Sequence, residues 1–395
     1  MKIDRYWLIA IMLFVLALFN KNEAYGHYRP VLIMLSFIIS IPIVLKYKNA
    51  YHLKYLLILY LWSFLTFFIA ENKSMASGQV TNGTAALLTC LSFFALAQKK
   101  FFIPIAYIIH IISIAVLAKF AYDNIYLPSA AYQVFGQDRF GESGVVNANT
   151  FAYYLFYLTF IIYILGDILK GRFSKYIKIV FFLIIPLTFF VAILTASRQV
   201  FIIQIPLITV LLLLRYSVKF SRFSFVAIVL GLLALVFLPR LTEVYSDSLL
   251  AERNKMEAVG EDARVEIAKS AIVVGTEHFF TGVGIGNFPT KSGGPMAHNS
   301  YLELYADTGI VGILVYIFLT FGFVKRQYNR YKQTKDRNYL SFMFFGIFFI
   351  FDNFFFVFYG DYGLMSFYIL VVTHAEIYHR DKTKLGMSQL VRKYN

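Results

Sequence analysis

The stretch GGPMAHNSYLELYADTGIVGILVYIFLTFGFVKR, residues 293–326, decides the fold class of this 395-residue chain. A polar, glycine-rich segment leads directly into an apolar run, which is long enough for a membrane-spanning helix of about 20 residues. Lys325 and Arg326 follow the run. The pattern predicts a helix that begins in a loop on one side of a bilayer and ends at a basic loop on the other side.

Similar apolar runs recur along the chain, in which 59% of the residues are hydrophobic. A soluble domain of this length could not bury so much apolar surface, whereas a polytopic helical membrane protein exposes it to lipid. The sequence therefore predicts an all-α polytopic membrane protein with about twelve transmembrane helices. The predicted helices cover residues 6–19, 31–45, 55–70, 80–97, 101–120, 150–169, 177–194, 200–214, 223–238, 301–324, 339–358 and 364–378.

The basic residues predict the orientation of these helices. With the N-terminus in the cytoplasm, most of the 37 Lys and Arg residues fall in the short inner segments, as the positive-inside rule requires. Both termini then face the cytoplasm. The same bias explains the net charge of +15 better than nucleic-acid binding does. The first apolar run resembles the core of a signal peptide, but no small-residue cleavage site follows it, so we expect it to be retained.

The predicted organisation is one integrated membrane domain with a large loop on its outer face. Helices one to nine lie in residues 1–238, the loop covers residues 239–299, and residues 300–395 hold helices ten to twelve and a cytoplasmic tail. Asp262 can cap a short helix within the loop that extends to about Val274. Its predicted apolar face consists of Val265, Ala268, Ala271 and Ile272.

His298 is the strongest candidate for chemistry among the 7 histidines. It alone is predicted on the outer side, near membrane depth and beside a glycine-rich turn. A neutral imidazole in that position can accept a proton from a hydroxyl at physiological pH. The alternative is that Asn299 or Ser300 caps the tenth helix and that His298 is only adjacent to the cap.

Three arginines in the predicted outer loops form a second candidate group: Arg139, Arg198 and Arg264. Their guanidinium groups have the shape to bind a diphosphate if the three loops converge. The alternative is that Arg139 and Arg264 pair with the acids beside them in the sequence. Arg198 has no neighbouring acid, and a cation at the membrane edge without a partner is costly.

The glycine-rich segment around Gly282, Gly284 and Gly286 superficially resembles a nucleotide-binding loop. No βαβ unit surrounds it and no Walker lysine follows it, so we do not expect nucleotide binding. Glycines at these positions can instead let the backbone approach the membrane domain or a phosphate.

Four acids fall near the outer membrane edge: Glu303, Asp307, Asp352 and Asp361. Glu303 and Asp307 lie four residues apart and share one face of the tenth helix. They could pair with the outer arginines, orient His298 or face water, and the sequence does not rank these roles. No group of Asp, His or Cys has metal-ligand spacing, so we expect neither a metal nor a cofactor.

The C-terminal half resembles the O-antigen ligase and polymerase superfamily of bacterial envelopes. The spacing from His298 to Gly309 and Gly312 is similar to the ligase pattern, as are the predicted twelve helices and the long outer loop. Ser197 and Arg198 with Ile202 resemble a short arginine turn of the family, in which Leu is more usual than Ile. The further segments that carry the resemblance are Arg139-Phe140-Gly141 with Asn147-Ala148-Asn149, Asp262-Ala263-Arg264, residues 280–288, residues 298–302 and residues 308–312.

The resemblance implies transfer of a glycan from undecaprenyl diphosphate on the outer face of the bacterial inner membrane. A ligase would use a hydroxyl of a lipid A-core sugar as the acceptor, and an O-antigen or exopolysaccharide polymerase would use the end of another lipid-linked repeat. The reaction would invert the anomeric carbon without a metal, and envelope-glycan assembly proteins are possible partners. The implied roles are general base for His298, diphosphate binding for Arg264, Arg198 and Arg139, and support for Asn299, Gly284, Gly286, Gly309, Gly312 and Glu303.

Two other classes of function compete with this interpretation. A polysaccharide or lipid transporter would place polar or broken helices at the bilayer midplane, often in repeated halves. Here the charges gather at the predicted outer edge and no internal repeat is evident. A scaffold in an envelope-assembly complex is the other alternative, and it would not need His298.

Overall fold

The computed structural model describes residues 4–19, 26–123, 148–169, 171–195, 203–216, 261–357 and 359–394. The regular elements in these ranges are all helical, which confirms the predicted all-α class. The predicted span at residues 223–238 lies outside them. Five of the described helical segments are long and apolar enough to cross a membrane, namely Tyr28–Lys46, Tyr51–Ile69, Lys73–Ala97, Lys100–Lys119 and Ser300–Thr334. The chain is therefore a multi-pass membrane protein.

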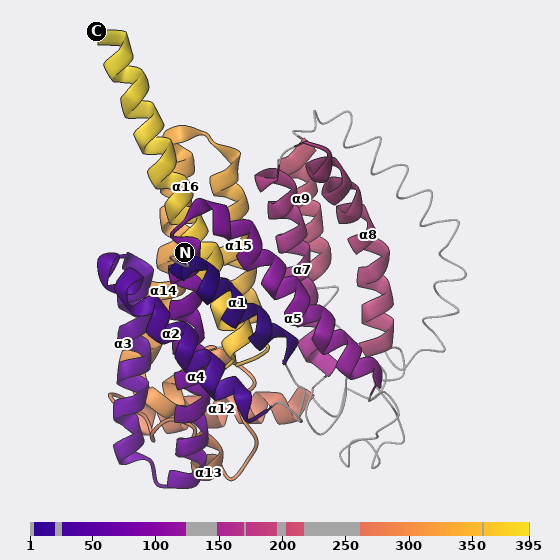
Figure 1. Ribbon diagram of the computed structural model, residues 1–395. Helices are drawn as coiled ribbons and strands as arrows, with labels where there is room; N and C mark the ends of the chain where they lie inside the picture. The colour runs from indigo at the N-terminus through magenta and orange to yellow at the C-terminus, as the bar shows by residue number, and fades with distance from the viewer. Residues whose placement is uncertain are drawn as a thin grey trace. The chain divides into compact units, whose positions relative to one another are not determined.

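The chain divides into two compact units. The larger one combines Met1–Ile112 with Glu266–Asn395, and the smaller one is Ser113–Val265. Figure 1 labels the helices of both. The elements that lie in the larger unit or begin or end there are α1 (Arg5–Leu18), α2 (Tyr28–Lys46), α3 (Tyr51–Leu65), η2 (Thr66–Ile69), α4 (Lys73–Ala97), η3 (Lys100–Phe102), α5 (Ile103–Asp123), α12 (Glu261–Glu277), α13 (Phe288–Ser292), α14 (Ser300–Thr334), α15 (Arg337–Asp352) and α16 (Tyr362–Tyr394).

The centre of the larger unit is formed by α4 and α16. Leu364 through Ala375 of α16 are all buried, and so are the last residues of α4, from Thr89 to Ala97. A helix that is buried on every side belongs to the interior of a bundle. The outer helices expose apolar residues instead, such as Ile38 at 52% and Leu61 at 62%. Such an apolar exterior is expected of helices in contact with lipid.

Polar side chains join the helices inside this bundle. Ser36 of α2 and Ser92 of α4 are hydrogen-bonded at 3.0 Å, and both are fully buried. Tyr107 of α5 bonds to Nδ1 of His374 in α16 at 3.1 Å. Lipid tails are as apolar as the helix surfaces, so such hydrogen bonds and close packing favour specific contacts between membrane helices.

The smaller unit contains α7 (Ala148–Ile168), α8 (Arg172–Thr195) and α9 (Ile205–Tyr216). Arg215 of α9 donates to Asp167 of α7 at 3.3 Å and lies 4.3 Å from the centre of the Tyr163 ring. The structure describes α8 up to Thr195 and α9 from Ile205. Residues 196–202 lie outside the described residues, so the predicted division between the seventh and eighth helices stays a prediction.

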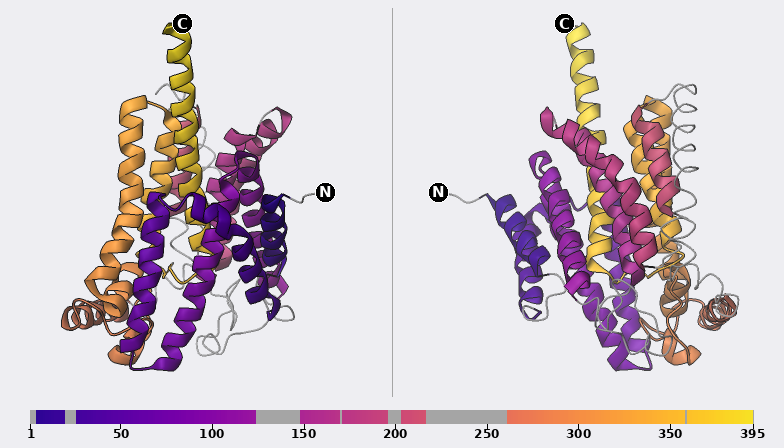
Figure 2. Two further views of the ribbon diagram at one scale, coloured as in Figure 1. Left: turned by 60° about the vertical axis from the view of Figure 1, so that its left-hand side comes forward. Right: turned by 90° about the vertical axis from the view of Figure 1, so that its right-hand side faces the viewer.

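The surface helix α12 crosses α14 at a steep angle in Figures 1 and 2. It begins at Glu261, so Asp262 lies in the first turn and is not the cap. The predicted apolar face is only partly correct. Ala271 is fully buried, but Val265 and Ile272 are each 50% exposed. The packed face is rotated toward Val274 because its partners are Val283, Phe288 and Ala306 on one side of the helix.

This packing predicts losses of stability of very different size for the same substitution at two nearby positions. Val274→Asp should destabilise the protein by about 3 kcal/mol or more, because it buries a charge without a partner. Ile272→Asp, the matched control, should cost well under about 1 kcal/mol because that side chain is half exposed. Thermal unfolding of the purified protein in detergent would measure both, and equal losses would contradict the packed face assigned to α12.

Candidate functional site

The long helix α14 is broken at Gly309, whose φ of 67° and ψ of −166° are not helical. In a continuous helix each carbonyl accepts from the N–H four residues later. The break frees three successive carbonyl groups from that pattern, and donors from other segments occupy them. The hydrogen bonds join Val283 N to Ala306 O, Gly284 N to Asp307 O and Trp62 Nε1 to Thr308 O, and each is 2.9 Å long.

The donors at Val283 and Gly284 belong to a segment that we call the glycine loop, residues 281–287. Its glycines at 282, 284 and 286 have φ values of 66°, 96° and 70°, a region that residues with a Cβ rarely adopt. The segment just before the loop also contacts α14, because the carbonyl of Phe279 accepts from the N–H of Ile310 at 2.7 Å. The loop and the broken helix therefore satisfy each other's backbone groups.

Asp307 fastens the same loop with its side chain. One carboxylate oxygen accepts from Gly286 N at 2.7 Å and the other from Phe288 N at 2.9 Å. Tyr359 donates to the first oxygen at 3.5 Å. The side chain is fully buried. Asp307 therefore does not face water, and its side chain holds the loop by accepting hydrogen bonds from two backbone N–H groups.

The loop lies directly against the membrane helices. A Cβ at Gly284 would come within 2.6 Å of the Cα of Ala70, and a Cβ at Gly282 would overlap the backbone of Asp307. A Cβ at Gly309 would overlap the backbone of Phe280. Gly312 faces Thr308, one turn earlier in α14, and Trp62 of α3. These glycines are positions of close backbone approach, and larger residues do not fit there without movement of a neighbour.

A second helix end holds the loop from the other side. The N–H of Asn72, which precedes α4, donates to the side-chain oxygen of Asn287 at 2.7 Å. The N–H of Ile285 donates to the hydroxyl of Thr66 at 3.2 Å. Polar groups buried in this way retain their hydrogen-bond partners, which keeps the loop in one conformation.

His298 lies immediately before α14 in an unusual backbone conformation. Its φ is 49° and its side chain is exposed. Among the described non-glycine residues only Lys335 also has a positive φ, and Lys335 is the left-handed C-cap of α14. A cap explains the strain at Lys335, but His298 precedes an N-cap. Backbone strain without a capping role is a recognised feature of functional positions.

The residues beside His298 are fixed on both sides. Asn299 is the N-cap of α14, and its side chain accepts from Tyr301 N at 2.9 Å and Leu302 N at 3.1 Å. The carboxylate of Glu303 is 2% exposed and accepts from the N–H of Ala297 at 2.6 Å. Glu303 and Asn299 together determine the path of the backbone through His298.

The first residues of α14 are also tied to the end of α15. Ser300 N donates to the carbonyls of Asn353 at 2.9 Å and Phe356 at 3.1 Å. Asp361 caps the start of α16 by accepting from Leu364 N at 2.8 Å. Asp352 is 1% exposed, and its Oδ2 has no hydrogen-bond partner among the described residues.

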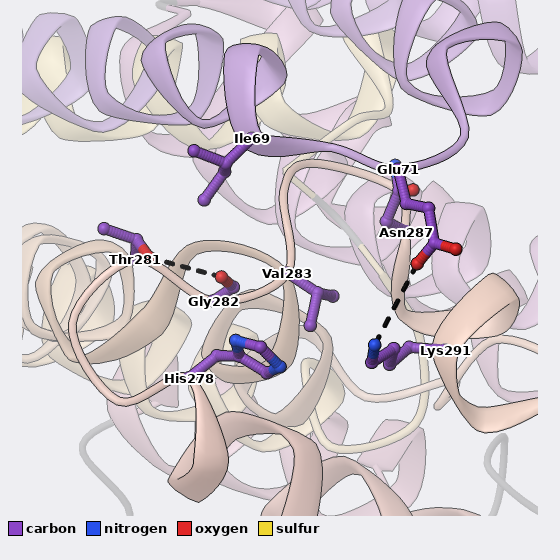
Figure 3. Close-up of a pocket in the computed structure, with 8 residues that line it drawn as sticks. All are labelled: Ile69, Glu71, His278, Thr281, Gly282, Val283, Asn287 and Lys291. Carbon is purple, nitrogen blue, oxygen red and sulfur yellow. Dashed lines mark hydrogen bonds and ion pairs between the residues drawn. The ribbon is translucent and has the colours of Figure 1, made fainter.

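A cavity of about 310 Å³ opens beside the glycine loop. Figure 3 shows the imidazole of His278 pointing into it, with Lys291 opposite and Ile69 above. Lys291 and Glu71 form an ion pair of 3.9 Å across the opening. His298 is not among the lining residues. Sequence reasoning missed His278 because the cavity brings residues 278–291 together with Ile69 and Glu71, which are far away in the chain.

The three candidate arginines remain predictions. Arg139 and Arg198 lie outside the described residues. Arg264 lies in the first turn of α12, and its side chain is likewise outside the described part. Within the residues that the structure describes, no cluster of three or more His, Cys, Asp and Glu could hold a metal ion.

The close approach of the glycine loop predicts different effects at two glycines with a positive φ. Gly284→Ala should lower the free energy of unfolding by about 3 kcal/mol, because the new Cβ adds an overlap with Ala70 to the backbone strain. Gly293 also has a positive φ, of 66°, but a Cβ there would meet nothing within 4 Å, so Gly293→Ala should cost only about 1 kcal/mol. Thermal unfolding in detergent separates the two effects. A loss at Gly293 as large as that at Gly284 would contradict the close approach.

The comparison with known families gives one match in this region of the chain. Residues 179–317 match the family model described as O-antigen ligase. The matched range includes α12, the glycine loop, His298 and the break at Gly309. No curated protein matches the chain. The match confirms the resemblance to the O-antigen ligase superfamily, whose members are membrane enzymes that ligate or polymerise glycans.

Proposed function

We propose that the chain is an O-antigen ligase-like glycosyltransferase that moves a glycan from undecaprenyl diphosphate to a hydroxyl of a lipid A-core type sugar. Transfer takes place on the outer face of the bacterial inner membrane, and both termini face the cytoplasm. The observation that carries the proposal is the placement of His298 in a strained conformation at the start of a broken membrane helix. This helix start lies inside the range that matches the O-antigen ligase model.

In this proposal His298 is the general base. A neutral ring nitrogen takes the proton of the acceptor hydroxyl while that oxygen forms a bond to the anomeric carbon. The bond from the same carbon to the diphosphate breaks, so the configuration inverts and undecaprenyl diphosphate departs. A positioned base contributes about 10²–10⁴-fold in rate. The hydrogen bonds of Asn299 and Glu303 support this role because they fix the backbone that carries the imidazole.

The leaving diphosphate needs positive charge, which we assign to Arg264, Arg198 and Arg139. Glu303 and Asp307 are already engaged by backbone N–H groups at 2.6–2.9 Å. Arginines that approach this region would therefore not be needed as partners of these acids, and their guanidinium groups would be available to bind an anionic substrate. A preorganised donor to developing charge contributes about 3 kcal/mol. No nucleotide is required, because the diphosphate donor is already activated.

A polymerase that joins lipid-linked repeats is the alternative within the same family. The two reactions differ in the acceptor, and deletion of the gene in its native cell separates them. Loss of ligation should leave free lipid-linked polymer, which we expect. Loss of polymerisation should leave single repeats on the acceptor, and that product would assign the protein to the polymerases.

Replacement of the base should abolish transfer without loss of the protein. His298→Asn is the sharper variant because Asn tolerates a left-handed backbone but cannot act as the base. We expect transfer of a lipid-linked glycan by the purified protein in nanodiscs to fall by about 10²–10⁴-fold. His278→Asn is the matched control, since His278 lines the neighbouring cavity, and it should retain most activity. Substantial activity of His298→Asn would reject the general-base role.

The shape of the guanidinium group should matter at position 198. Arg198→Lys keeps the positive charge but loses the planar fork that binds two phosphate oxygens at once. We expect transfer to be severely impaired, by about 100-fold, which corresponds to the loss of one strong donor. Initial rates at saturating acceptor over a range of donor concentrations provide the measurement. Near-normal turnover would show that Arg198 has a structural role only.

A further inference from the structure

A second cavity, of about 330 Å³, lies at the opposite end of α3 from the glycine loop. It is enclosed by the turn between α2 and α3, the end of α4 and one side of α16. In the predicted orientation this end faces the cytoplasm. The residues on its wall that the argument uses are Lys46, Tyr47, His52, Thr373, Glu376 and Arg380.

His52 presents an unsatisfied acceptor in this cavity. The Thr373 hydroxyl donates its single proton to the Ile369 carbonyl at 2.7 Å. The contact of 3.0 Å between this hydroxyl and Nε2 of His52 therefore places the ring proton on Nε2. Nδ1 keeps a free lone pair, and it has no partner among the described residues although His52 is only 2% exposed. A buried acceptor of this kind needs a donor from a ligand or water.

Arg380 and Lys46 supply positive charge to the same space. Nζ of Lys46 and Cζ of Arg380 each lie 5.6 Å from the centre of the Tyr47 ring. Neither residue forms an ion pair among the described residues. The buried Nε of Arg380 also has no hydrogen-bond partner there. The acid on the wall, Glu376, is already held by two hydrogen bonds from Arg330 at 3.0 and 2.6 Å. The cavity is thus lined by two cations without an ion pair among the described residues. Two of its lining residues, Arg380 and His52, each carry a buried polar atom without a partner there.

The surface next to the cavity is suited to lipid chains. Leu45 directly precedes Lys46 and is 62% exposed, and Ile38, seven residues earlier on the same face of α2, is 52% exposed. Residues seven apart on a helix point in nearly the same direction. An amphiphile could therefore hold its charged group beside Lys46 and lay its chains along α2.

We propose that this cavity binds the head group of an anionic glycerophospholipid that carries a free hydroxyl, as phosphatidylglycerol does. The phosphodiester accepts from Arg380 and lies near Lys46, and a hydroxyl of the head group donates to Nδ1 of His52. Basic pockets between membrane helices on the cytoplasmic side are a known mode of anionic lipid recognition. A guanidinium and a phosphate form a strong charge-assisted hydrogen bond.

The test is lipid binding to the delipidated full-length protein in detergent, measured by native mass spectrometry. Phosphatidylglycerol should bind at least about tenfold more tightly than phosphatidylcholine, which has no net charge. It should also bind more tightly than phosphatidylmethanol, which has the same charge but no head-group hydroxyl. Equal binding of all three lipids would overturn the proposal, since it would indicate lipid bound only around the helices.

Variants identify the cavity as the site. Lys46→Gln with Arg380→Gln should weaken phosphatidylglycerol binding by about tenfold or more. Lys48→Gln is the matched control, because Lys48 is exposed on the same turn but does not line the cavity. Thermal unfolding without lipid checks that the variants fold. Equal binding by both variants would overturn the proposal.

The phosphate in the cavity could belong to a membrane lipid or to a soluble phosphorylated ligand. Binding of soluble glycerol phosphate distinguishes these two sources. It carries a phosphate and glycerol hydroxyls but no chains, so it should bind at least about tenfold more weakly than the lipid. Equal affinity for glycerol phosphate would overturn the lipid assignment in favour of a soluble phosphorylated ligand.

Discussion

The end of the larger unit that holds the glycine loop depends on one interruption, the break of α14 at Gly309. A continuous helix would use the carbonyls of Ala306, Asp307 and Thr308 for itself. The break offers them to the glycine loop and to Trp62 of α3, and it lets Ile310 donate to Phe279. Non-helical backbone is tolerated in a membrane protein only where other protein groups satisfy it. The loop and the break therefore require each other.

This arrangement also shows the structural role of the two acidic side chains near the site, Asp307 and Glu303. Asp307 closes the glycine loop, and Glu303 holds the chain just before His298. Both accept hydrogen bonds from backbone N–H groups, so neither needs an arginine as its partner. The proposed mechanism rests on this separation, with acids that build the scaffold and guanidinium groups that meet the substrate.

Much of this architecture follows from local sequence signals. The apolar runs, the cap at Asn299 and the suitability of the glycines for close backbone approach could all be predicted, because each depends on residues near one another in the chain. The break at Gly309 could not, since Thr308-Gly309-Ile310 lies within an apolar run and its partners Phe279 and Trp62 are distant in sequence. The same reason explains why the packed face of α12 was predicted only partly correctly, since its partners include residues of α14 and the glycine loop.

The central claim is that transfer takes place at His298, at the start of the broken helix. An experimental structure of the protein in nanodiscs with bound undecaprenyl diphosphate tests it most directly. The account predicts that the diphosphate lies beside the His298 imidazole, with the guanidinium groups of Arg198 and Arg264 in contact with its oxygens. A diphosphate bound away from His298, for example in the cavity into which His278 points, would contradict the account.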